Sequence, residues 1–470
     1  MQGLFVKLSK NANSNRLGSV IFLIRWTLAA SWLFRLSVAL VVCSLSALAQ
    51  DGTNLFSKPL TLADALEIAL KRNTSILQAH ADIRANEGVV IQTRSIALPR
   101  VSATGGYTAQ DEGLIENIPM PSAGIAQPSQ NWQSGIRVQQ SIYEGGRLTS
   151  ALRAAKLTRE ASQLNYETTV SDTLLAVRIA YLDTLLGSQQ IVVQEASVKL
   201  LTRELDDVRR RFNAGTVPQF NVLRAEVELA NAQPKLIRAR NACRIAKNNL
   251  VNLLGLDLPR DLLENIPLEL SDHLDAQPFG IDLTMAVAKA LDQRTELAAL
   301  RKLYALRRED IVNVRGGYKP SAQVFAGWQW RSPNFSSDLT RDFNGWQAGA
   351  QLSWNIFDGQ LTRGKVFEAE ARFTRARLDI EDTTRRIELQ VRTAYSDLIQ
   401  EKEVLESQKK VQEQAEEALR LAEARMDAGS GTQLDVLGAQ TSLTEARTTQ
   451  IQGLHDYEVA VARLNRAMGK

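Results

Sequence analysis

The sequence predicts a mainly helical protein with a membrane β-barrel, built from duplicated long antiparallel coiled-coil hairpins plus four strands per chain. Three observations support this fold class. Apolar residues keep a helical spacing over very long segments, short segments alternate in polarity with a period of two, and one internal repeat covers most of the 470 residues. A repeat of that length outweighs any local pattern when domains are assigned.

The first long helical hairpin is predicted over residues 148–254. No proline interrupts its first arm, which as a helix would span about 100 Å. In the turn, Gly215 predicts the helix stop, Thr216 an N-cap and Pro218 a first helical turn. The returning arm keeps an unbroken 3-4-3-4 spacing typical of a coiled-coil seam, in which Pro234 predicts a local kink. The seam residues are Val222, Ala225, Leu229, Ala232, Leu236, Ala239, Cys243, Ala246, Leu250 and Leu253.

The hairpin occurs a second time at a constant offset of 214 residues, which places the second copy over residues 361–468. The matching pairs include Ala180 with Ala394, Gly215 with Gly429, Val222 with Val436, Leu229 with Leu443, and Gly255 with Gly469. Upstream the offset becomes 221, so that Leu62, Ala65, Ala69 and Pro99 match Leu283, Ala286, Ala290 and Pro320. The predicted organisation is a leader (1–49), a first repeat (50–255), an inter-repeat linker with short helical pieces (256–281) and a second repeat (282–470).

A shorter helix is expected to open each repeat. In the first repeat, Thr61 is the predicted N-cap of an amphipathic helix whose first turn includes Asp64. The helical pattern breaks near Asn73, resumes, and ends before Pro99, because the residue before a proline disfavours the helical conformation.

Residues 1–49 are predicted to be an extended signal peptide. Arg35 precedes a long apolar run, and an Ala-x-Ala cleavage site ends at Ala49. Lipidation at Cys43, in place of cleavage after Ala49, remains an alternative, although lipoprotein signals have a smaller residue than valine before the cysteine. Cleavage would leave Cys243 as the one cysteine of the chain, which excludes an intrachain disulfide.

Two strands are predicted within Pro99–Tyr143 and two within Pro320–Phe357, because polar and apolar residues alternate there. Each segment has about 10 residues, the length of a tilted membrane-spanning strand. One face is apolar and the other is rich in glutamine, which suits lipid on one side and water on the other. All tryptophans outside the leader lie in these segments, as expected for aromatic girdles at membrane interfaces. They are Trp132, Trp328, Trp330, Trp346 and Trp354.

Four strands cannot close a barrel, and an open sheet edge in lipid leaves backbone groups without hydrogen bonds. The chain is therefore expected to oligomerise so that these edges pair. Two helical hairpins are likewise too few to enclose a wide bore. Several copies together are predicted to form a strand barrel that continues into a helical tube.

The duplicated order of helix, two strands, long helix, glycine turn and long helix resembles the TolC-like outer membrane efflux protein family, the outer membrane factors. The motifs that carry the resemblance are Leu62-x-x-Ala65-Leu66-x-x-Ala69, Phe212-x-x-Gly215-Thr216 and Asp435-Val436-Leu437. It covers nearly all of residues 60–470. The resemblance implies a homotrimer with an α-helical tube in the periplasm and a 12-stranded β-barrel, four strands from each chain, in the lipid of the cell outer membrane. It also implies two protein partners, a periplasmic adaptor (membrane fusion) protein and an inner membrane pump.

The same resemblance places functional residues at the hairpin tips. Asp435 matches an acidic position that lines the pore constriction, whereas Gly438, Asn221 and Arg224 occupy the other positions where a second ring could form. A single Asp435 ring is therefore expected. A carboxylate there is also favoured by the helix N-terminus alone, and the two roles are compatible. The implied adaptor-docking turns, each also explained by making the turn, contain Phe212, Gly215, Thr216, Pro218, Met426, Gly429 and Ser430.

Catalysis and nucleic-acid binding are not expected. The histidines His80, His273 and His455 match no metal or catalytic-triad spacing, and no phosphate-binding glycine loop is present. No cofactor or metal is predicted. Five of the 56 basic residues lie in the leader, which leaves 51 against 52 acidic residues and no basic excess for nucleic acid.

The function implied is a passive trimeric exit duct for small molecules across the periplasm and outer membrane, the channel of a tripartite efflux system. One alternative is the exit duct of a type I protein secretion system, which differs only in cargo. An alternative from a different class is a periplasmic coiled-coil scaffold with a soluble β-head.

Overall fold

The computed structural model describes residues 59–114, 129–257, 266–334 and 338–470. The predicted leader, with Cys43 and Ala49, lies outside them. The chain forms two compact units, of which the smaller comprises Met1–Leu60 and Leu256–Ser271. In its described part, Leu60 N donates to Glu269 O at 2.8 Å. The larger unit comprises Thr61–Gly255 and Asp272–Lys470 and holds every described helix and strand.

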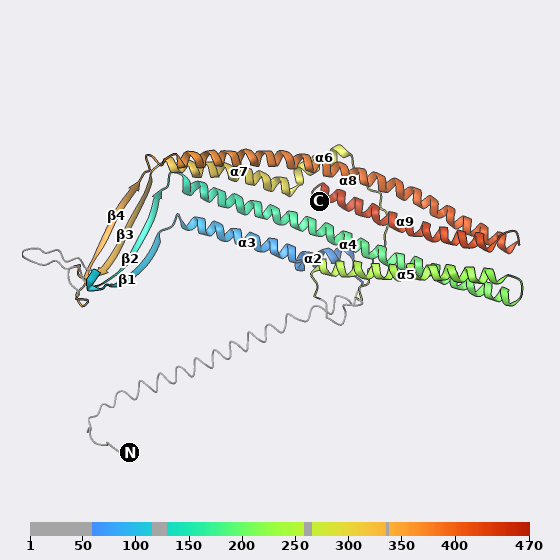
Figure 1. Ribbon diagram of the computed structural model, residues 1–470. Helices are drawn as coiled ribbons and strands as arrows, with labels where there is room; N and C mark the ends of the chain where they lie inside the picture. Colours follow the sequence, from blue (N-terminus) through green and yellow to red (C-terminus); the bar gives the residue numbers. More distant parts are fainter. Residues whose placement is uncertain (1–58, 115–128, 258–265, 335–337) are drawn as a thin grey trace, which may run out of the picture. The chain divides into compact units, whose positions relative to one another are not determined.

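The larger unit contains the same order of elements twice (Figure 1). The first set is α2 (Leu62–Arg72), α3 (Thr74–Ser95), β1 (Arg100–Ala109), β2 (Gln130–Tyr143), α4 (Arg147–Asn213) and α5 (Gln219–Leu254). The second set is α6 (Leu283–Gln293), α7 (Thr295–Arg315), β3 (Ser321–Arg331), β4 (Phe343–Ser353), α8 (Leu361–Asp427) and α9 (Gln433–Ala467). Within this unit the four strands lie at one end of the helices and both hairpin tips lie at the other (Figure 1).

Local capping explains where the first helices begin. The Thr61 hydroxyl accepts from Asp64 N at 3.1 Å, as expected for an N-cap. The break between α2 and α3 falls at Asn73, whose Oδ1 accepts from Ser75 N at 2.9 Å while its Nδ2 donates to Leu253 O at 2.7 Å. Asn73 therefore caps the start of α3 and hydrogen-bonds the end of α5.

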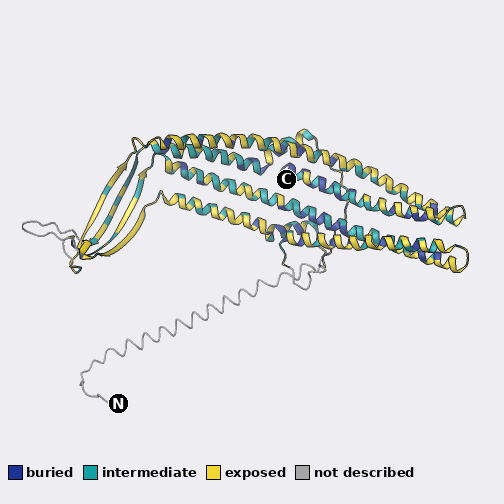
Figure 2. Cartoon of the chain, viewed as in Figure 1, coloured by how far each residue is buried: buried dark blue, intermediate teal, exposed yellow. Residues whose placement is uncertain are grey.

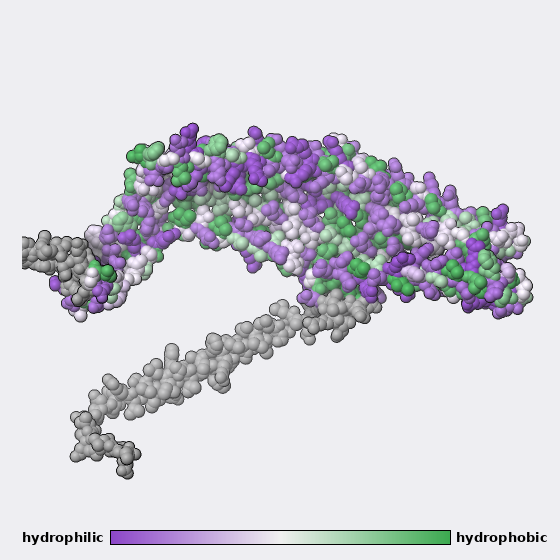
Figure 3. Space-filling model, viewed as in Figure 1, coloured by the Kyte–Doolittle hydropathy of each residue, from purple (hydrophilic) through white to green (hydrophobic). Residues whose placement is uncertain are grey.

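Corresponding arms of the two hairpins have nearly the same length. The first arms, α4 and α8, have 67 residues each, and the returning arms, α5 and α9, have 36 and 35. None of the ten predicted seam positions of α5 is exposed, and the alanines Ala225, Ala232 and Ala239 are buried (Figure 2). The helical surface turned to the viewer in Figure 3 is mainly hydrophilic, with hydrophobic residues scattered over it. The helix is continuous through Pro234.

The turn at the end of α4 corrects one expectation. Thr216 is not an N-cap, because its hydroxyl donates to Arg211 O at 2.8 Å and closes the end of α4. The N-cap of α5 is Pro218, which has no side-chain donor or acceptor, so this proline lies just before the first helical turn and not within it. Gly215 has φ +73°, the left-handed conformation that lets the chain leave the helix.

The helices of the second repeat enclose a hydrophobic core. Its buried members are Ala286, Ala290, Leu297, Ile387, Val391, Leu398, Tyr457, Ala460, Leu464, Ala467 and Met468. The Tyr457 hydroxyl accepts from Phe279 N at 3.0 Å and donates to Gln277 O at 2.9 Å, so it holds the linker against this core. Described residues 266–281 of the linker form no helix, and Pro267 and Pro278 disfavour one there. The rest of the linker in which short helical pieces are expected, residues 258–265, lies outside the described residues.

A buried cation joins the two repeats. Arg466 on α9 donates through Nε to Asp172 of α4 at 2.7 Å and through Nη2 to Glu296 of α7 at 2.5 Å. The guanidinium is almost fully buried, so its pairing with these two carboxylates is needed to offset the loss of water.

The strands form one antiparallel sheet in the order β1-β2-β3-β4, in which β2 and β3 join the two repeats. No residue of any strand is buried (Figure 2). Trp354, expected in the fourth strand, lies just past its end, because β3 starts at Ser321 opposite Ser353 and leaves Trp354 no partner. Its indole Nε1 instead donates to Tyr318 O at 3.0 Å.

Candidate functional site

The register gives the sheet two chemically different faces. Residues directly opposite each other in antiparallel strands point to the same face. Tyr107 pairs with Trp132, Ile136 pairs with Trp328, and Trp328 pairs with Trp346. One face is therefore apolar across all four strands, and Trp346 on it is 75% exposed.

The opposite face is polar and carries a ladder of glutamine amides. Gln139 Nε2 donates to Gln323 Oε1 at 2.5 Å, and Gln323 Nε2 donates to Gln351 Oε1 at 3.0 Å. These bonds cross from β2 to β3 to β4. Trp132, Trp328, Trp330 and Trp346 lie on the other side, so the structure brings four of the five predicted tryptophans to one face.

The first hairpin tip is closed by its own backbone. Gly215 N donates to Phe212 O at 2.8 Å and Thr216 N donates to Arg211 O at 2.9 Å. Phe212, Gly215, Thr216 and Pro218 are all exposed. The predicted docking residues of this tip are thus accessible, and Gly215 and Thr216 also close the turn.

The second tip holds Asp435 in a capping box. Thr432 is the N-cap of α9, and Asp435 Oδ2 accepts from the Thr432 backbone N at 2.9 Å and its hydroxyl at 2.7 Å. These two bonds lower the pKa of the Asp435 carboxyl below its usual value, the side-chain bond most strongly. The carboxylate is exposed and ionised at neutral pH. Met426 is half-buried, whereas Gly429 and Ser430 are exposed.

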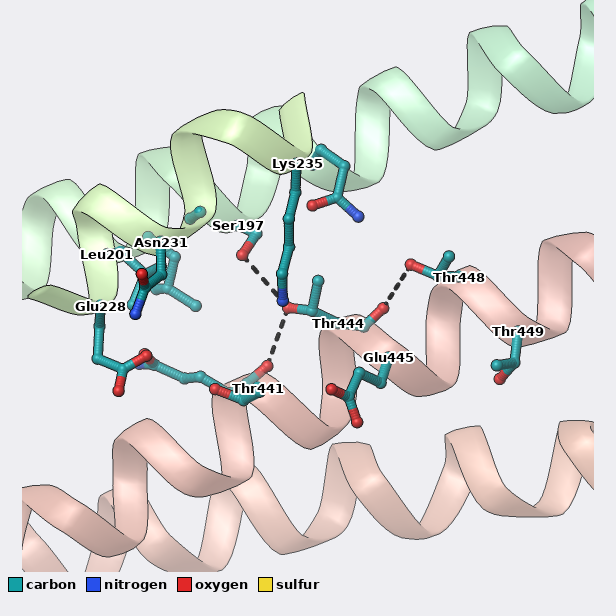
Figure 4. A pocket seen from close by; sticks show the side chains of 14 residues that line it. Ser197, Leu201, Glu228, Asn231, Lys235, Thr441, Thr444, Glu445, Thr448 and Thr449 are labelled. Atoms are coloured by element: carbon teal, nitrogen blue, oxygen red, sulfur yellow. Dashed lines mark hydrogen bonds between the residues drawn. The ribbon is translucent and has the colours of Figure 1, made fainter. Parts of the chain in front are cut away.

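Polar contacts tie the two hairpins together near their tips. Gln433 Nε2 of α9 donates to Glu204 Oε1 of α4 at 3.3 Å. Burial raises the pKa of the Glu204 carboxyl, and the bond from Gln433 only partly opposes this effect. Further along, Thr444 Oγ1 lies 3.4 Å from Ser197 Oγ (Figure 4).

A groove of about 250 Å³ runs between the first hairpin and α9 at this level (Figure 4). Its lining includes Glu228, Lys235 and Glu445, together with hydroxyl groups of α9. Gln440 is buried in its wall and its Oε1 has no hydrogen-bond partner. The two hairpins thus meet through a polar, incompletely packed surface.

Sequence reasoning missed a histidine contact deeper in the molecule. His455 Nε2 lies 2.8 Å from Asp183 Oδ1 of α4, and its Nδ1 lies 2.9 Å from Asp456 Oδ1. Burial lowers the pKa of His455, but the two carboxylates outweigh burial and raise it above the usual 6.5. The sequence offered no signal for this contact, because His455 and Asp183 are 272 residues apart.

Among the described residues, no group of three or more His, Cys, Asp or Glu side chains could hold a metal ion. In the same part of the chain, no helix is both long enough and apolar enough to cross a membrane.

Comparison with known proteins identifies the family. The family described as outer membrane efflux protein matches residues 65–256 and 286–470. The chain belongs to this family. The outer membrane protein TolC of Vibrio cholerae is 23% identical over 416 residues, which cover 87% of this chain and 90% of that protein.

Two further comparisons define the family resemblance. The alkaline protease secretion protein AprF of Pseudomonas aeruginosa is 24% identical over 292 residues, 62% of this chain and 60% of AprF. The fold is that of the CmeC outer membrane channel of Campylobacter jejuni, with a TM-score of 0.75 at 15% identity, over 87% of this chain and 85% of CmeC. This efflux protein is thus a TolC-like channel of the outer membrane.

Proposed function

We propose that three copies of this chain form a continuous exit duct for small molecules, with the strands in the outer membrane and the helices in the periplasm. The observation that carries the proposal is a sheet without any buried residue, apolar on one face and polar on the other. A sheet in a water-soluble domain covers its apolar face with another layer. Lipid outside and water inside would satisfy both faces at once, which disfavours the scaffold with a soluble β-head.

Strand length and edges agree with a membrane barrel. The 11 residues of β3 extend about 36 Å, and at the usual tilt they cover about 27 Å, close to the hydrocarbon thickness. In the part of the chain that the structure describes, β1 and β4 each have one unpaired edge. Pairing β4 of one copy with β1 of the next removes every edge, and three copies give 12 strands.

The packing of α9 against α4 within the chain indicates how α5 would pack against α8 of a neighbouring copy. On α9, Leu437 and Val459 are buried, whereas their counterparts on α5, Leu223 and Ile245, are 53% and 51% exposed. In the chain, α9 packs against α4 of the other repeat. By the repeat symmetry, α5 would pack against α8 of a neighbouring copy and bury these residues in the same way.

Thiol cross-linking tests this arrangement. Asn241 and Asp397 are the counterparts of His455 and Asp183, offset by 214 residues. In a Cys243→Ala background, Asn241→Cys with Asp397→Cys should yield covalent dimers and trimers with a short bis-maleimide. The matched control, His455→Cys with Asp183→Cys, should link only within the chain. Links confined to single chains in both variants would contradict the trimer.

The tips are proposed as the regulated entrance. Asp435 from three copies would form one carboxylate ring, and the exposed turns around Phe212, Gly215, Gly429 and Ser430 would dock a periplasmic adaptor that connects the duct to an inner membrane pump. In planar bilayers, Asp435→Asn should reduce cation selectivity. Thr432→Ala is the control, since it breaks the capping box but keeps the carboxylate. Equal selectivity of wild type and Asp435→Asn would remove the ring from the proposal.

Protein secretion is the second candidate, favoured by the similarity to AprF, which is named for protease secretion. Both uses need the same duct and differ in the pump that feeds it. Deletion of the gene in its native host distinguishes them: sensitivity to small toxic compounds supports efflux, and loss of an extracellular protein supports secretion.

A further inference from the structure

The four strands contain three charged residues, and all of them are arginines on the polar face. Arg100 pairs with Gln139, Arg137 pairs with Ser102, and Arg331 pairs with Gln133, each within the polar set. No aspartate, glutamate, lysine or histidine occurs in β1, β2, β3 or β4. Such a bias is unexpected for a neutral water-lined surface, where both signs are usually interspersed.

These arginines have no acidic partner among the described residues. The arginine ion pairs of the structure lie in the helices, and none involves Arg100, Arg137 or Arg331. Arg331 donates to the neutral side chain of Asn334. The guanidinium of Arg137 lies 5.3 Å from the centre of the Phe325 ring. Stacking of this kind holds the cation without neutralising it, and leaves its edge donors available.

A hollow of about 370 Å³ on the polar face is lined by two of these arginines. Its lining includes Arg137, Arg331 and the amides of Gln133, Gln329 and Gln347. Gly135 and Gly327 contribute no side chain there: a Cβ on Gly327 would lie 2.6 Å from Ile136 O. The hollow thus combines guanidinium and amide donors, which is the donor set that carboxylates and phosphates accept from.

The three charges are close enough to act together. Arg331 pairs with Gln133 of β2, and Arg100 pairs with Gln139 of β2. Measured along β2, the three arginines therefore lie beside positions 133, 137 and 139. The steps are about 13 Å and about 7 Å at the usual rise per residue, comparable with the screening length of about 8 Å in physiological salt. Their fields therefore overlap along the strand direction.

We propose that this arginine face makes the barrel segment of the duct selective for small anions, with carboxylate- or phosphate-bearing solutes as the favoured cargo. The inference rests on the proposed trimeric duct, in which three arginines from each of three copies give nine cations around the bore. The duct then carries opposite signs at its two ends, carboxylates at the Asp435 tip and guanidinium groups in the barrel. Because guanidinium stays protonated at all accessible pH values, the barrel's preference is independent of pH.

Reversal potentials in planar bilayers under a KCl gradient test the proposal. The Asp435→Asn channel is the reference, because it removes the opposing charge at the tip, and it should prefer chloride. Adding Arg137→Gln and Arg331→Gln should lower the chloride-to-potassium permeability ratio by at least about threefold, since surface potentials of this origin reach several kT at low salt. Replacing both arginines by glutamate should reverse the preference.

The matched control is the double lysine variant, Arg137→Lys with Arg331→Lys, which keeps the charge and should keep the ratio. The preference of the reference channel should also persist in acid that protonates carboxylates. An unchanged permeability ratio in open channels with Arg137→Gln and Arg331→Gln overturns the anion-selective face but leaves the proposed duct intact.

Absence of channel activity from the wild-type protein overturns the proposed duct itself. If the glutamine channels fail to open, an Arg137→Cys channel treated with cationic or anionic thiol reagents decides: selectivity shifts of opposite sign support the proposal, and equal shifts contradict it.

Discussion

The two repeats bury equivalent positions with different side chains. In the second repeat, Ile387, Leu398 and Tyr457 fill the space between the helices. The residues 214 positions earlier are Thr173, Thr184 and Cys243, and all three are also buried. The first repeat therefore maintains the same helix arrangement with less apolar volume.

Close backbone approach replaces side-chain volume in the first repeat. A Cβ on Gly187 would lie 2.9 Å from Cys243 Cα, so α4 and α5 contact each other almost backbone to backbone at this level. The counterparts of Gly187 and Cys243 are Glu401 and Tyr457, which are far larger. The two repeats thus keep the same helix order and nearly the same helix lengths with side chains of very different size at equivalent positions.

Replacing the glycine that ends each hairpin by alanine should give the largest difference in stability loss between the two repeats. Gly255 has φ +67°, and a Cβ there would lie 2.4 Å from Arg72 O, whereas at Gly469 the nearest atom would be 3.0 Å away. Gly255→Ala should destabilise by about 4 kcal/mol and Gly469→Ala by about 2 kcal/mol. Thermal unfolding in detergent measures both, and equal shifts would contradict the packing difference.

Shortening a buried side chain should destabilise the second repeat more than the first, and this is the next largest expected difference. Leu398→Ala should cost about 3 kcal/mol, because it leaves a cavity among buried apolar side chains. Thr184→Ala should cost only about 1 kcal/mol, since the Thr184 hydroxyl bonds within its own helix, to Ala180 O at 2.8 Å, and few apolar atoms are lost. Denaturant titration of each variant checks the ranking. A larger loss at Thr184 would show that the first core depends on volume after all.

His455 should make the contact between the repeats depend on pH. Its folded-state pKa is raised by Asp183 and Asp456 despite burial, so its contribution is complete below the unfolded value of 6.5 and is lost as pH rises through the folded value. Thermal stability should therefore fall from mildly acidic to alkaline pH. His455→Asn copies Asn241 of the first repeat and should remove that part of the slope. If the pH dependence of thermal stability is unchanged in His455→Asn, other titrating groups cause it.

The smallest expected effect lies where the sheet leads into the helices. Gln360 precedes α8 with φ +71°, whereas its counterpart before α4 is Gly146 with φ +92°. Gln360→Gly should stabilise by about 1 kcal/mol, because glycine adopts this conformation without strain. Gly146→Gln should destabilise by a similar amount. The midpoint of thermal unfolding reports both signs, and destabilisation by Gln360→Gly would contradict the account.

Much of the fold could be predicted because its signals are local and repeated. The helical spacing, the glycine at each tip and the constant offset of 214 residues each required only nearby residues or a comparison of the sequence with itself. Capping was less predictable: Thr216 matches Ser430 in the second tip, and both hydroxyls donate to a carbonyl at the end of the preceding helix. The N-caps lie two residues later, at Pro218 and Thr432, and of these Thr432 forms a capping box with Asp435. The choice between capping a helix start and closing a helix end depends on backbone geometry.

The sequence by itself determined the helix lengths, the alternation of the strands and the duplication, since hydrophobic periodicity and turn residues are properties of contiguous segments. Only the tertiary structure decided that β2 pairs with β3, that His455 contacts Asp183, and that Arg100, Arg137 and Arg331 share one face. Those relations join residues far apart in the chain, where pairing depends on the register and packing of whole elements and not on any local preference.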